Sequence, residues 1–337
     1  MKAVGLLKYL SITDPEALVD FDLPTPVPGE RDLLVKVEAV SVNPIDTKVR
    51  LSGTGQEPEP RVLGWDAAGV VLKVGTEVSR FRPGDEVYYA GSITRPGANS
   101  EFHLVDERIV GHKPITLNYA EAAALPLTTI TAWESLFERL HVPLSGLQGT
   151  KTILMIGGAG GVGSIGIQLA KWAKLQVIAT ASRVETRKWC MALGADHVID
   201  HRQPLSAGLQ NIGLLAVDYI ANFASTDLYW EIMSEVIAPE GYICAIVAGK
   251  HALDLNPLRN KSVTFGWESM FTKSRYCTSG MGSQGALLDE VAQLIDRGTL
   301  KTTLVKTVSP INAANLRHAH ELIESGRTIG KIVLAGW

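Results

Sequence analysis

The stretch Gly157–Gly163, with the sequence GGAGGVG, follows an apolar run, Thr152–Ile156, and precedes an amphipathic one, Ser164–Ala173. This order is typical of a strand, a tight turn and a helix. Three of the glycines fit the G-x-G-x-x-G spacing, in which bare backbone approaches a pyrophosphate at a helix N-terminus. Surface loops also contain such strings, so the flanking strand and helix are what favour a dinucleotide site here.

The end of the next expected strand, Gln176–Ala181, indicates which dinucleotide is bound. NAD-binding folds usually place a carboxylate there for the ribose hydroxyls, whereas this chain has Ser182 and Arg183. A hydroxyl and a guanidinium can bind a 2′-phosphate that a carboxylate would repel, so the sequence favours NADPH. His201 and Arg202 follow the third expected strand, His197–Ile199, and could reach the same pocket. In the alternative interpretation, Ser182 caps the following helix and Arg183 is solvated.

Length and composition set the class of protein. A chain of 337 residues is too long for one compact core, which predicts two domains. Hydrophobic residues at 46% and charged residues at 20% are ordinary for a globular protein. The net charge of -3 provides no broad cationic surface, which argues against a dedicated nucleic-acid or anionic-membrane binder. Small-molecule chemistry is the function class that remains.

Cysteine usage and the N-terminus bear on location. Cys190, Cys244 and Cys277 lie far apart without a C-x-x-C pair, which predicts a reducing compartment. Met1–Leu10 lacks the basic start, longer apolar stretch and cleavage site of a signal peptide. No apolar run approaches the roughly 20 residues that a membrane-spanning helix needs. We therefore expect a cytoplasmic protein without a membrane segment.

The chain changes character along its length. Short strand patterns punctuated by glycine and proline extend to about Asp106, which indicates a β-rich part. Ala120–Leu140 has a helical pattern that Pro126 should break into two pieces. From Lys151 onward, strand and helix patterns alternate, which predicts βαβ units and a parallel sheet. The expected domains are 1–125 with 266–337, and an inserted dinucleotide-binding domain, 126–265.

Five further motifs occur in order along the chain. They are VNPIDT at 42–47, GWDAAGVV at 64–71, FRPGDEV at 81–87, GADHVI at 194–199 and GKIVL at 330–334. Together with the glycine-rich turn, they make the chain resemble the medium-chain dehydrogenase/reductase superfamily over nearly its whole length. It is most similar to the zinc-independent quinone oxidoreductases, the relatives of zeta-crystallin. The resemblance implies an α/β fold, with a Rossmann doubly wound parallel sheet inserted in a β-rich GroES-like catalytic domain, and a homodimer.

At the positions where zinc-dependent members of this superfamily have their zinc ligands, this chain has other residues. Those members place a cysteine near Asn43–Asp46, Gly-His-Glu at Gly64–Asp66 and another cysteine near Leu127. None of these zinc-binding side chains is present, and the four-cysteine lobe of the relatives is also missing. Tryptophan and leucine have no donor atom for zinc. We expect no metal, with Asp46 and Asp66 as the only carboxylates that could contradict this.

The reaction follows from the expected lack of a Lewis acid. A metal contributes several kcal/mol to stabilising an alkoxide, so a conjugated acceptor that spreads the added charge is favoured. The resemblance implies the same chemistry, a hydride transferred from NADPH to a quinone or an α,β-unsaturated carbonyl. Two alternatives remain open. One is an alcohol dehydrogenase with an unconventional metal site, and the other is a non-catalytic NADPH-binding protein, such as a sensor, a crystallin-like structural protein or an RNA binder.

The resemblance also assigns the substrate side of the site. Asn43 would donate a hydrogen bond to the substrate oxygen and Asp46 would organise the loop, although Asp46 could equally form an Asx turn around Pro44. Many relatives have tyrosine at the position of Lys48 and another aromatic residue near Gly55, so this chain departs from them at both. Lys48 could donate a proton to developing charge, or simply be a surface lysine.

Two further residues complete the expected catalytic set. Trp65 would wall the pocket and stack on a quinone ring, the alternative being core packing. Thr131 would hydrogen-bond beside the nicotinamide, the alternative being a bond to its own backbone.

The expected cofactor contacts lie at the turn, at the ends of the following strands and on the last strand. They are Gly158, Gly160, Gly161, Val162, Gly163, Ser182, Arg183, His201, Asn222, Phe223, Val247, Ala248 and Lys331. Asn222, Phe223, Val247 and Ala248 are included because ligands of open α/β sheets bind at the carboxyl ends of the strands. Lys331 is included because the resemblance implies that it approaches the cofactor from the start of the last strand. Ser262–Trp267 should be an edge strand, which invites symmetric pairing with a second copy.

Overall fold

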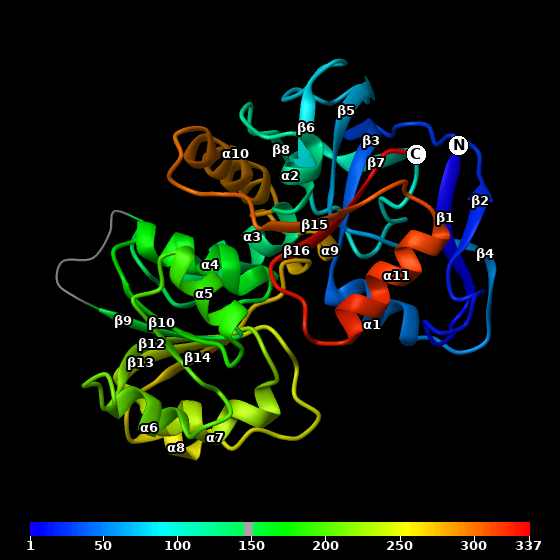
Figure 1. The fold of residues 1–337 in the computed structure, drawn as a ribbon. Coiled ribbons are helices and arrows are strands. Elements are labelled where there is room, and N and C mark those ends of the chain that lie inside the picture. The colour runs from blue at the N-terminus through cyan, green and yellow to red at the C-terminus, as the bar shows by residue number, and fades with distance from the viewer. Residues whose placement is uncertain (145–150) are drawn as a thin grey trace. The chain divides into compact units, whose positions relative to one another are not determined.

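The computed structural model describes residues 1–144 and 151–337. These form two compact units (Figure 1). Unit 1 comprises Met1–Leu127 and Phe271–Trp337, and unit 2 comprises Thr128–Met270. The sequence placed the boundaries at 125/126 and 265/266 instead, and the assignment of the two domains stays a prediction.

Unit 2 contains a six-stranded sheet in the order β11-β10-β9-β12-β13-β14. Its strand pairs are parallel, which confirms the expected α/β class. The central strand β9 is wholly buried, as expected for a strand that is apolar from Ile153 to Ile156. The strands are β9 (Thr152–Ile156), β10 (Gln176–Thr180), β11 (His197–Ile199), β12 (Val217–Asn222), β13 (Ile237–Ala245) and β14 (Thr264–Trp267).

Helices cover both faces of this sheet, α4 and α5 on one face and α6, α7 and α8 on the other (Figure 1). A hydrophobic core that includes Ile220, Trp230 and Met233 fills the space between the sheet and α6–α8. The helices are α4 (Gly161–Trp172), α5 (Val184–Ala192), α6 (Leu205–Gln210), α7 (Thr226–Val236) and α8 (Asn256–Arg259).

Unit 1 is built mainly from antiparallel strands. A seven-stranded sheet has the order β15-β16-β3-β5-β6-β8, with β7 paired to β3, and a three-stranded sheet has the order β2-β1-β4. The strands are β1 (Lys2–Lys8), β2 (Val19–Asp22), β3 (Asp32–Val42), β4 (Gln56–Val62), β5 (Ala67–Val74), β6 (Glu86–Tyr89), β7 (Phe102–Asp106), β8 (Val110–His112), β15 (Leu304–Val308) and β16 (Lys331–Ala335). Because β16 pairs with β3, the last part of the chain completes the sheet that the first part begins.

Helices surround the sheets of unit 1. Helix α11 packs against α1, and α10 packs against β8. The helices are α1 (Pro44–Leu51), η1 (Glu107–Ile109), α2 (Tyr119–Ala123), α9 (Thr272–Arg275), α10 (Ser283–Asp296) and α11 (Ala313–Glu324).

The helical pattern around Pro126 is broken where the sequence predicted. Helix α2 ends at Ala123, and α3 (Pro126–Trp133) begins at the proline. The structure adds a feature that the sequence analysis missed, because α3 continues into a π-helix, η2 (Glu134–Arg139).

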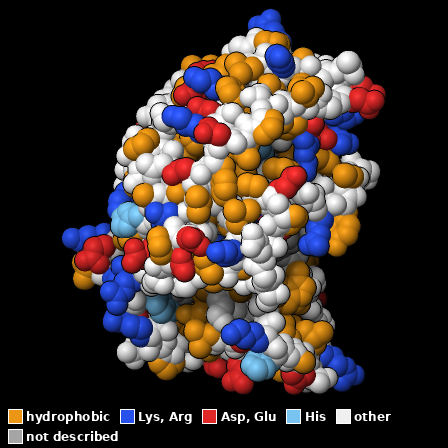
Figure 2. Space-filling model, turned by 90° about the vertical axis from the view of Figure 1, so that its right-hand side faces the viewer, with side chains coloured by type: hydrophobic (Ala, Val, Ile, Leu, Met, Phe, Trp, Pro, Cys, Tyr) orange, Lys and Arg blue, Asp and Glu red, His pale blue; other side chains and the backbone are white. Residues whose placement is uncertain are grey.

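Surface charge and helix apolarity are the properties on which nucleic-acid and membrane binding depend. On the face drawn in Figure 2, basic and acidic side chains are intermixed without a broad field of one sign. Within residues 1–144 and 151–337, no helix combines the length and the apolarity needed to cross a membrane.

Candidate functional site

The glycine-rich turn of unit 2 joins the end of β9 to the start of α4. Gly157 has a φ of 87°, a conformation that glycine adopts without steric cost. Its N–H donates to Thr180 Oγ1 at 3.0 Å, which attaches the turn to β10. Gly160 is the N-cap of α4, and no side chain in the described part of the molecule caps it. The first N–H groups of the helix can therefore bind an anion.

Two glycines of this turn are required by packing. A Cβ on Gly158 would lie 2.8 Å from Ala179 Cβ, and a Cβ on Gly163 would lie 2.4 Å from Gly157 O. Gly161 and Val162 occupy the first turn of α4 between them. The spacing read from the sequence thus coincides with close approach of turn, helix and strand.

Beyond the carboxyl ends of β10 and β11, the structure brings Arg202 into contact with Ser182. Ser182 is half-buried, while Arg183 and His201 are exposed. Arg202 Nη2 donates to Ser182 O at 3.2 Å and to Asp200 Oδ2 at 2.6 Å. Asp200 is a carboxylate close to the predicted phosphate pocket that the sequence analysis did not consider, and Arg202 neutralises it.

The alternative in which Ser182 caps α5 is wrong. The N-cap position belongs to Arg183, and the Thr186 hydroxyl accepts from Arg183 N at 3.1 Å. Thr186 Oγ1 also donates to Arg183 O at 2.8 Å. Because Thr186 already bonds the backbone at the helix start, the Ser182 hydroxyl is not needed for capping.

The carboxyl ends of β12 and β13 hold the next predicted contacts. Asn222 is fully buried, and its Oδ1 accepts from Ala224 N at 3.0 Å. Its Nδ2 has no hydrogen-bond partner among the described residues, so a buried donor is left for a ligand. Phe223 and Val247 are half-buried and Ala248 is exposed at the same edge. Thr131, on α3, is buried within unit 2.

In unit 1 the structure assembles a buried polar cluster from residues far apart in sequence. Asn43 Nδ2 donates to Asp66 Oδ2 at 2.9 Å, and Leu127 N donates to Asp66 Oδ1 at 2.9 Å. Lys331 Nζ donates to Val42 O at 3.0 Å, lies 3.1 Å from Asp66 Oδ2 and donates to Asn43 Oδ1. Lys331 and Asn43 are 3% and 1% exposed. Their polar atoms are therefore used inside the protein, which favours positioning roles for both.

Asp46 lies at the start of α1, beside this cluster. Its Oδ2 accepts from Asn43 N at 2.7 Å, as in a capping box at the start of α1. Its Oδ1 has no hydrogen-bond partner in the described ranges. Burial raises the pKa of Asp46 to about 7, against the opposing hydrogen bond from Asn43.

Trp65 and Lys48 differ in environment. Trp65 is buried and donates from Nε1 to Ser92 O at 3.0 Å. Its ring packs edge-on against that of Phe271, with 6.1 Å between the ring centroids. These contacts are those of a packed interior side chain. Lys48 is exposed on α1, as a surface lysine would be.

The donor set of unit 1 does not fit zinc. Trp65 and Leu127 have no ligand atom for a metal, and Asp66 is bound by an ammonium, an amide and a backbone N–H. A second cation at the same carboxylate would meet the charge of Lys331. Across residues 1–144 and 151–337, no group of three His, Cys, Asp or Glu side chains could hold a metal ion.

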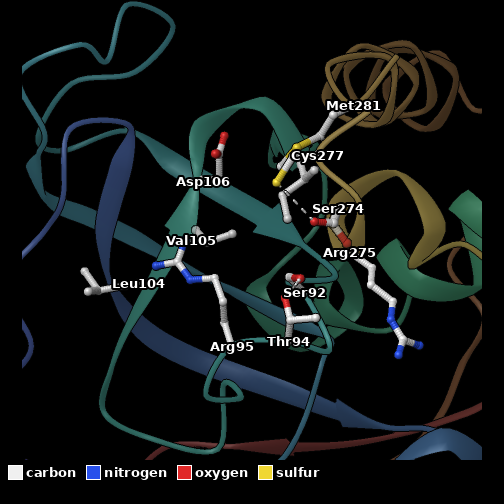
Figure 3. Close-up of a pocket in the computed structure, with 11 residues that line it drawn as sticks. Ser92, Thr94, Arg95, Leu104, Val105, Asp106, Ser274, Arg275, Cys277 and Met281 are labelled. Carbon is white, nitrogen blue, oxygen red and sulfur yellow. Dashed lines mark hydrogen bonds between the residues drawn. The ribbon is translucent and has the colours of Figure 1, made fainter. Parts of the chain in front are cut away.

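A separate cavity of about 130 Å³ in unit 1 was not expected from the sequence. Figure 3 shows Ser274 and Cys277 on one side and strand β7 on the other. The Arg95 guanidinium in its wall is held by both oxygens of Asp32, at 2.8 and 3.0 Å. No site residue predicted from the sequence lines it, so we do not assign it to the site.

The sequence and the fold are similar to those of known proteins. The model of the Alcohol dehydrogenase GroES-like domain matches residues 29–130, and that of Zinc-binding dehydrogenase matches residues 193–334. A "Zinc-type alcohol dehydrogenase-like protein" of Staphylococcus epidermidis is 39% identical over 99% of both chains. The chain belongs to the medium-chain dehydrogenase/reductase superfamily. It is therefore an oxidoreductase of this superfamily, as the sequence motifs implied.

Two solved structures of superfamily members are similar over the whole chain. One is a Rhizobium etli protein whose name proposes a zinc-dependent alcohol dehydrogenase, with 52% identity, a TM-score of 0.95 and coverage of 100% of this chain and 98% of that chain. The other is Escherichia coli quinone oxidoreductase complexed with NADPH, with 25% identity, a TM-score of 0.84 and coverage of 99% and 100%. Members named for zinc and for quinones thus share this fold.

Proposed function

We propose that this protein is an NADPH-dependent oxidoreductase that transfers hydride to a quinone or an α,β-unsaturated carbonyl without zinc. The observation that carries the proposal is the uncapped α4 N-terminus behind a glycine turn that tolerates no Cβ at Gly163. The similarity to the quinone oxidoreductase complexed with NADPH supports the same coenzyme class. The unit 1 donor set supports a conjugated acceptor, which needs no Lewis acid.

Each part of the chain has a role in this proposal. NADPH, when bound, supplies the hydride. The α4 N-terminus binds its pyrophosphate, and Ser182 and Arg183 bind its 2′-phosphate. Asn222 Nδ2, which has no hydrogen-bond partner among the described residues, donates to the coenzyme at the sheet edge. His201, Phe223, Val247 and Ala248 remain predicted contacts.

We propose narrower roles for the residues that are expected to lie near the substrate. Because the Asn43 amide and the Lys331 ammonium are both engaged in unit 1, we assign them to positioning rather than to direct contact. Asp46 can hold a proton near neutral pH and is our candidate donor to the reduced product. Trp65, Lys48 and Thr131 stay predicted substrate-side residues.

The function is tested by mixing the purified protein anaerobically with NADPH and a panel of quinones and enones. We expect oxidation of the nicotinamide, followed by its absorbance, with at least one acceptor class. Failure with every acceptor, although NADPH binds, would support the non-catalytic alternative. Titration with labelled RNA then tests the RNA-binding form of that alternative.

The names of several relatives favour a second candidate, a zinc-type alcohol dehydrogenase. Stoichiometric zinc in the purified protein, together with alcohol oxidation that a chelator abolishes, would establish it. We expect substoichiometric zinc and quinone or enone reduction that survives the chelator, because no zinc donor set is assembled among the described residues.

We also propose a cytoplasmic homodimer without a nucleic-acid partner. Strand β14 is an edge of the unit 2 sheet, and Trp267 on it is 45% exposed. An uncovered edge can pair with that of a second copy. Light scattering coupled to size exclusion measures the mass, and a monomer at all concentrations would contradict the dimer.

Coenzyme preference gives a specific prediction for Ser182→Asp. A carboxylate in this position would repel the 2′-phosphate, whereas the Arg202 guanidinium nearby is already paired with Asp200. We expect the dissociation constant for NADPH to rise by about 10- to 100-fold, with little change for NADH. Isothermal titration with both nucleotides measures the ratio. Equal losses for the two would show that Ser182 does not face the phosphate.

A further inference from the structure

Unit 2 contains a pair of buried acidic side chains that the proposed reaction does not use. Glu134 is the first residue of the π-helix η2 and Glu268 follows directly after β14. They are 1% and 2% exposed. Arg139, from the other end of η2, places its Nε 2.9 Å from Glu268 Oε2. Glu268, which is buried, is thus paired with Arg139, which is half-buried, and Glu134 is buried as well.

Glu268 is the acid that Glu134 affects most directly. Glu134 raises the pKa of Glu268 through a side-chain hydrogen bond and through its charge. Among the described residues, Glu268 Oε1 and Oε2 have no other hydrogen-bond partner, although Arg139 Nε lies 2.9 Å from Oε2. Two carboxyl groups can hydrogen-bond each other only when one of them is protonated. Burial, reinforced by this bond and by the charge of Glu134, raises the pKa of Glu268, against the opposing charge of Arg139. The other charged or titratable groups near the pair are Glu138 on η2 and Cys244 on β13. Burial raises the pKa of the Cys244 thiol to about 12, so this thiol is neutral at neutral and moderately alkaline pH.

The pair stands at the edge of the sheet where the coenzyme contacts are expected. Glu268 N donates to Ala245 O at 3.0 Å, and Ile246 N donates to Asn222 O at 3.3 Å. The backbone after β14 is therefore hydrogen-bonded to Ala245, the last residue of β13. Val247 and Ala248, which are expected coenzyme contacts, follow two and three residues later. In open α/β sheets this carboxyl edge is where ligands bind.

The π-helix is a second reason to expect a role. Such helices are rare and frequently lie at functional sites. Here η2 supplies both Glu134 and Arg139, and it packs against β13. The π-helix thus places Glu134 and Arg139 near Glu268, at the end of β14, where we expect the coenzyme to bind.

We propose that Glu134 and Glu268, sharing one proton, form a positioning pair that fixes the carboxyl end of β14 for binding of the nicotinamide coenzyme. The inference rests on the proposed coenzyme binding. When alkaline solution removes the shared proton, two carboxylates face each other, the end of β14 is released and coenzyme binding weakens. Neither residue is assigned to the chemical step.

Glu134→Gln tests the pair, because its amide can donate to Glu268 at every pH and the Arg139 ion pair is kept. Glu231→Gln, at an exposed position of α7, is the matched control. The dissociation constant of NADPH is measured by titration calorimetry from about pH 6 to about pH 10. We expect the wild type and the control to lose about tenfold more affinity than Glu134→Gln over this range.

Stability provides a readout that does not need the coenzyme. A carboxyl group whose pKa is raised by folding binds its proton more tightly in the native state, so stability falls as pH rises above the unfolded value. The melting temperature of the wild type should therefore fall relative to that of Glu134→Gln as pH rises. Glu268→Gln serves as the second variant if Glu134→Gln does not fold.

The outcomes separate the two proposals. If the wild type binds neither NADPH nor NADH at any pH, the proposed function fails and the positioning role fails with it. If the wild type binds NADPH with a pH dependence that both glutamine variants share, only the positioning pair is overturned. An infrared carbonyl band of a buried carboxylic acid, present in the wild type at neutral pH and lost in the variants, would support the shared proton.

Discussion

Gly163→Ala is expected to weaken NADPH binding by about 100-fold, although it adds only one methyl group. The new Cβ would lie 2.4 Å from Gly157 O and 2.7 Å from Gly158 Cα. Both are backbone atoms, so the glycine turn must shift away from α4. The shift would displace the N–H groups at the helix start, which the proposed site uses to bind pyrophosphate.

Nucleotide titration of the folded variant measures this loss. Gly282→Ala is the control, because a Cβ on Gly282 meets no atom within 4 Å. Circular dichroism and a cooperative thermal transition should show that both variants fold. Wild-type affinity in a cooperatively melting Gly163→Ala protein would mean that the turn does not bind the dinucleotide.

The sequence was most informative where structure is local. Thr152–Ile156 and His197–Ile199 were predicted with the bounds that β9 and β11 have. Continuous apolar runs bounded by turn residues are typical of buried parallel strands, so little else was needed. The break at Pro126 was predictable for the same reason, since proline limits a helix without tertiary help.

The parts of the site that depend on distant partners could not be predicted in this way. Asn43 and Lys331 are separated by 288 positions, and only folding shows that they hydrogen-bond. The resemblance therefore implied a substrate contact for Asn43 and a coenzyme contact for Lys331, whereas the geometry favours positioning roles for both. The π-helix Glu134–Arg139 follows no spacing rule that distinguishes it from an α-helix, so its acid pair with Glu268 was missed.

Lys331→Met is expected to lower the free energy of unfolding by about 3 to 5 kcal/mol, the cost typical of removing one partner of a buried ion pair. Asp66 is fully buried, and burial already raises its pKa, while the ammonium at 3.1 Å is the largest opposing influence. Methionine would fill the space but leave the carboxylate without its charge partner. Lys48→Met, on the exposed face of α1, should have little effect.

The double variant Lys331→Met/Asp66→Asn distinguishes a positioning lysine from one that binds the coenzyme. Asparagine removes the uncompensated charge, so we expect it to restore most of the stability in urea unfolding. If the charge pair only positions Asn43, NADPH affinity should recover together with stability. If Lys331 instead contacts the coenzyme, as the sequence motif first implied, stability would recover while the affinity stayed low. In that case, Lys331 would pair with Asp66 only in the protein without coenzyme.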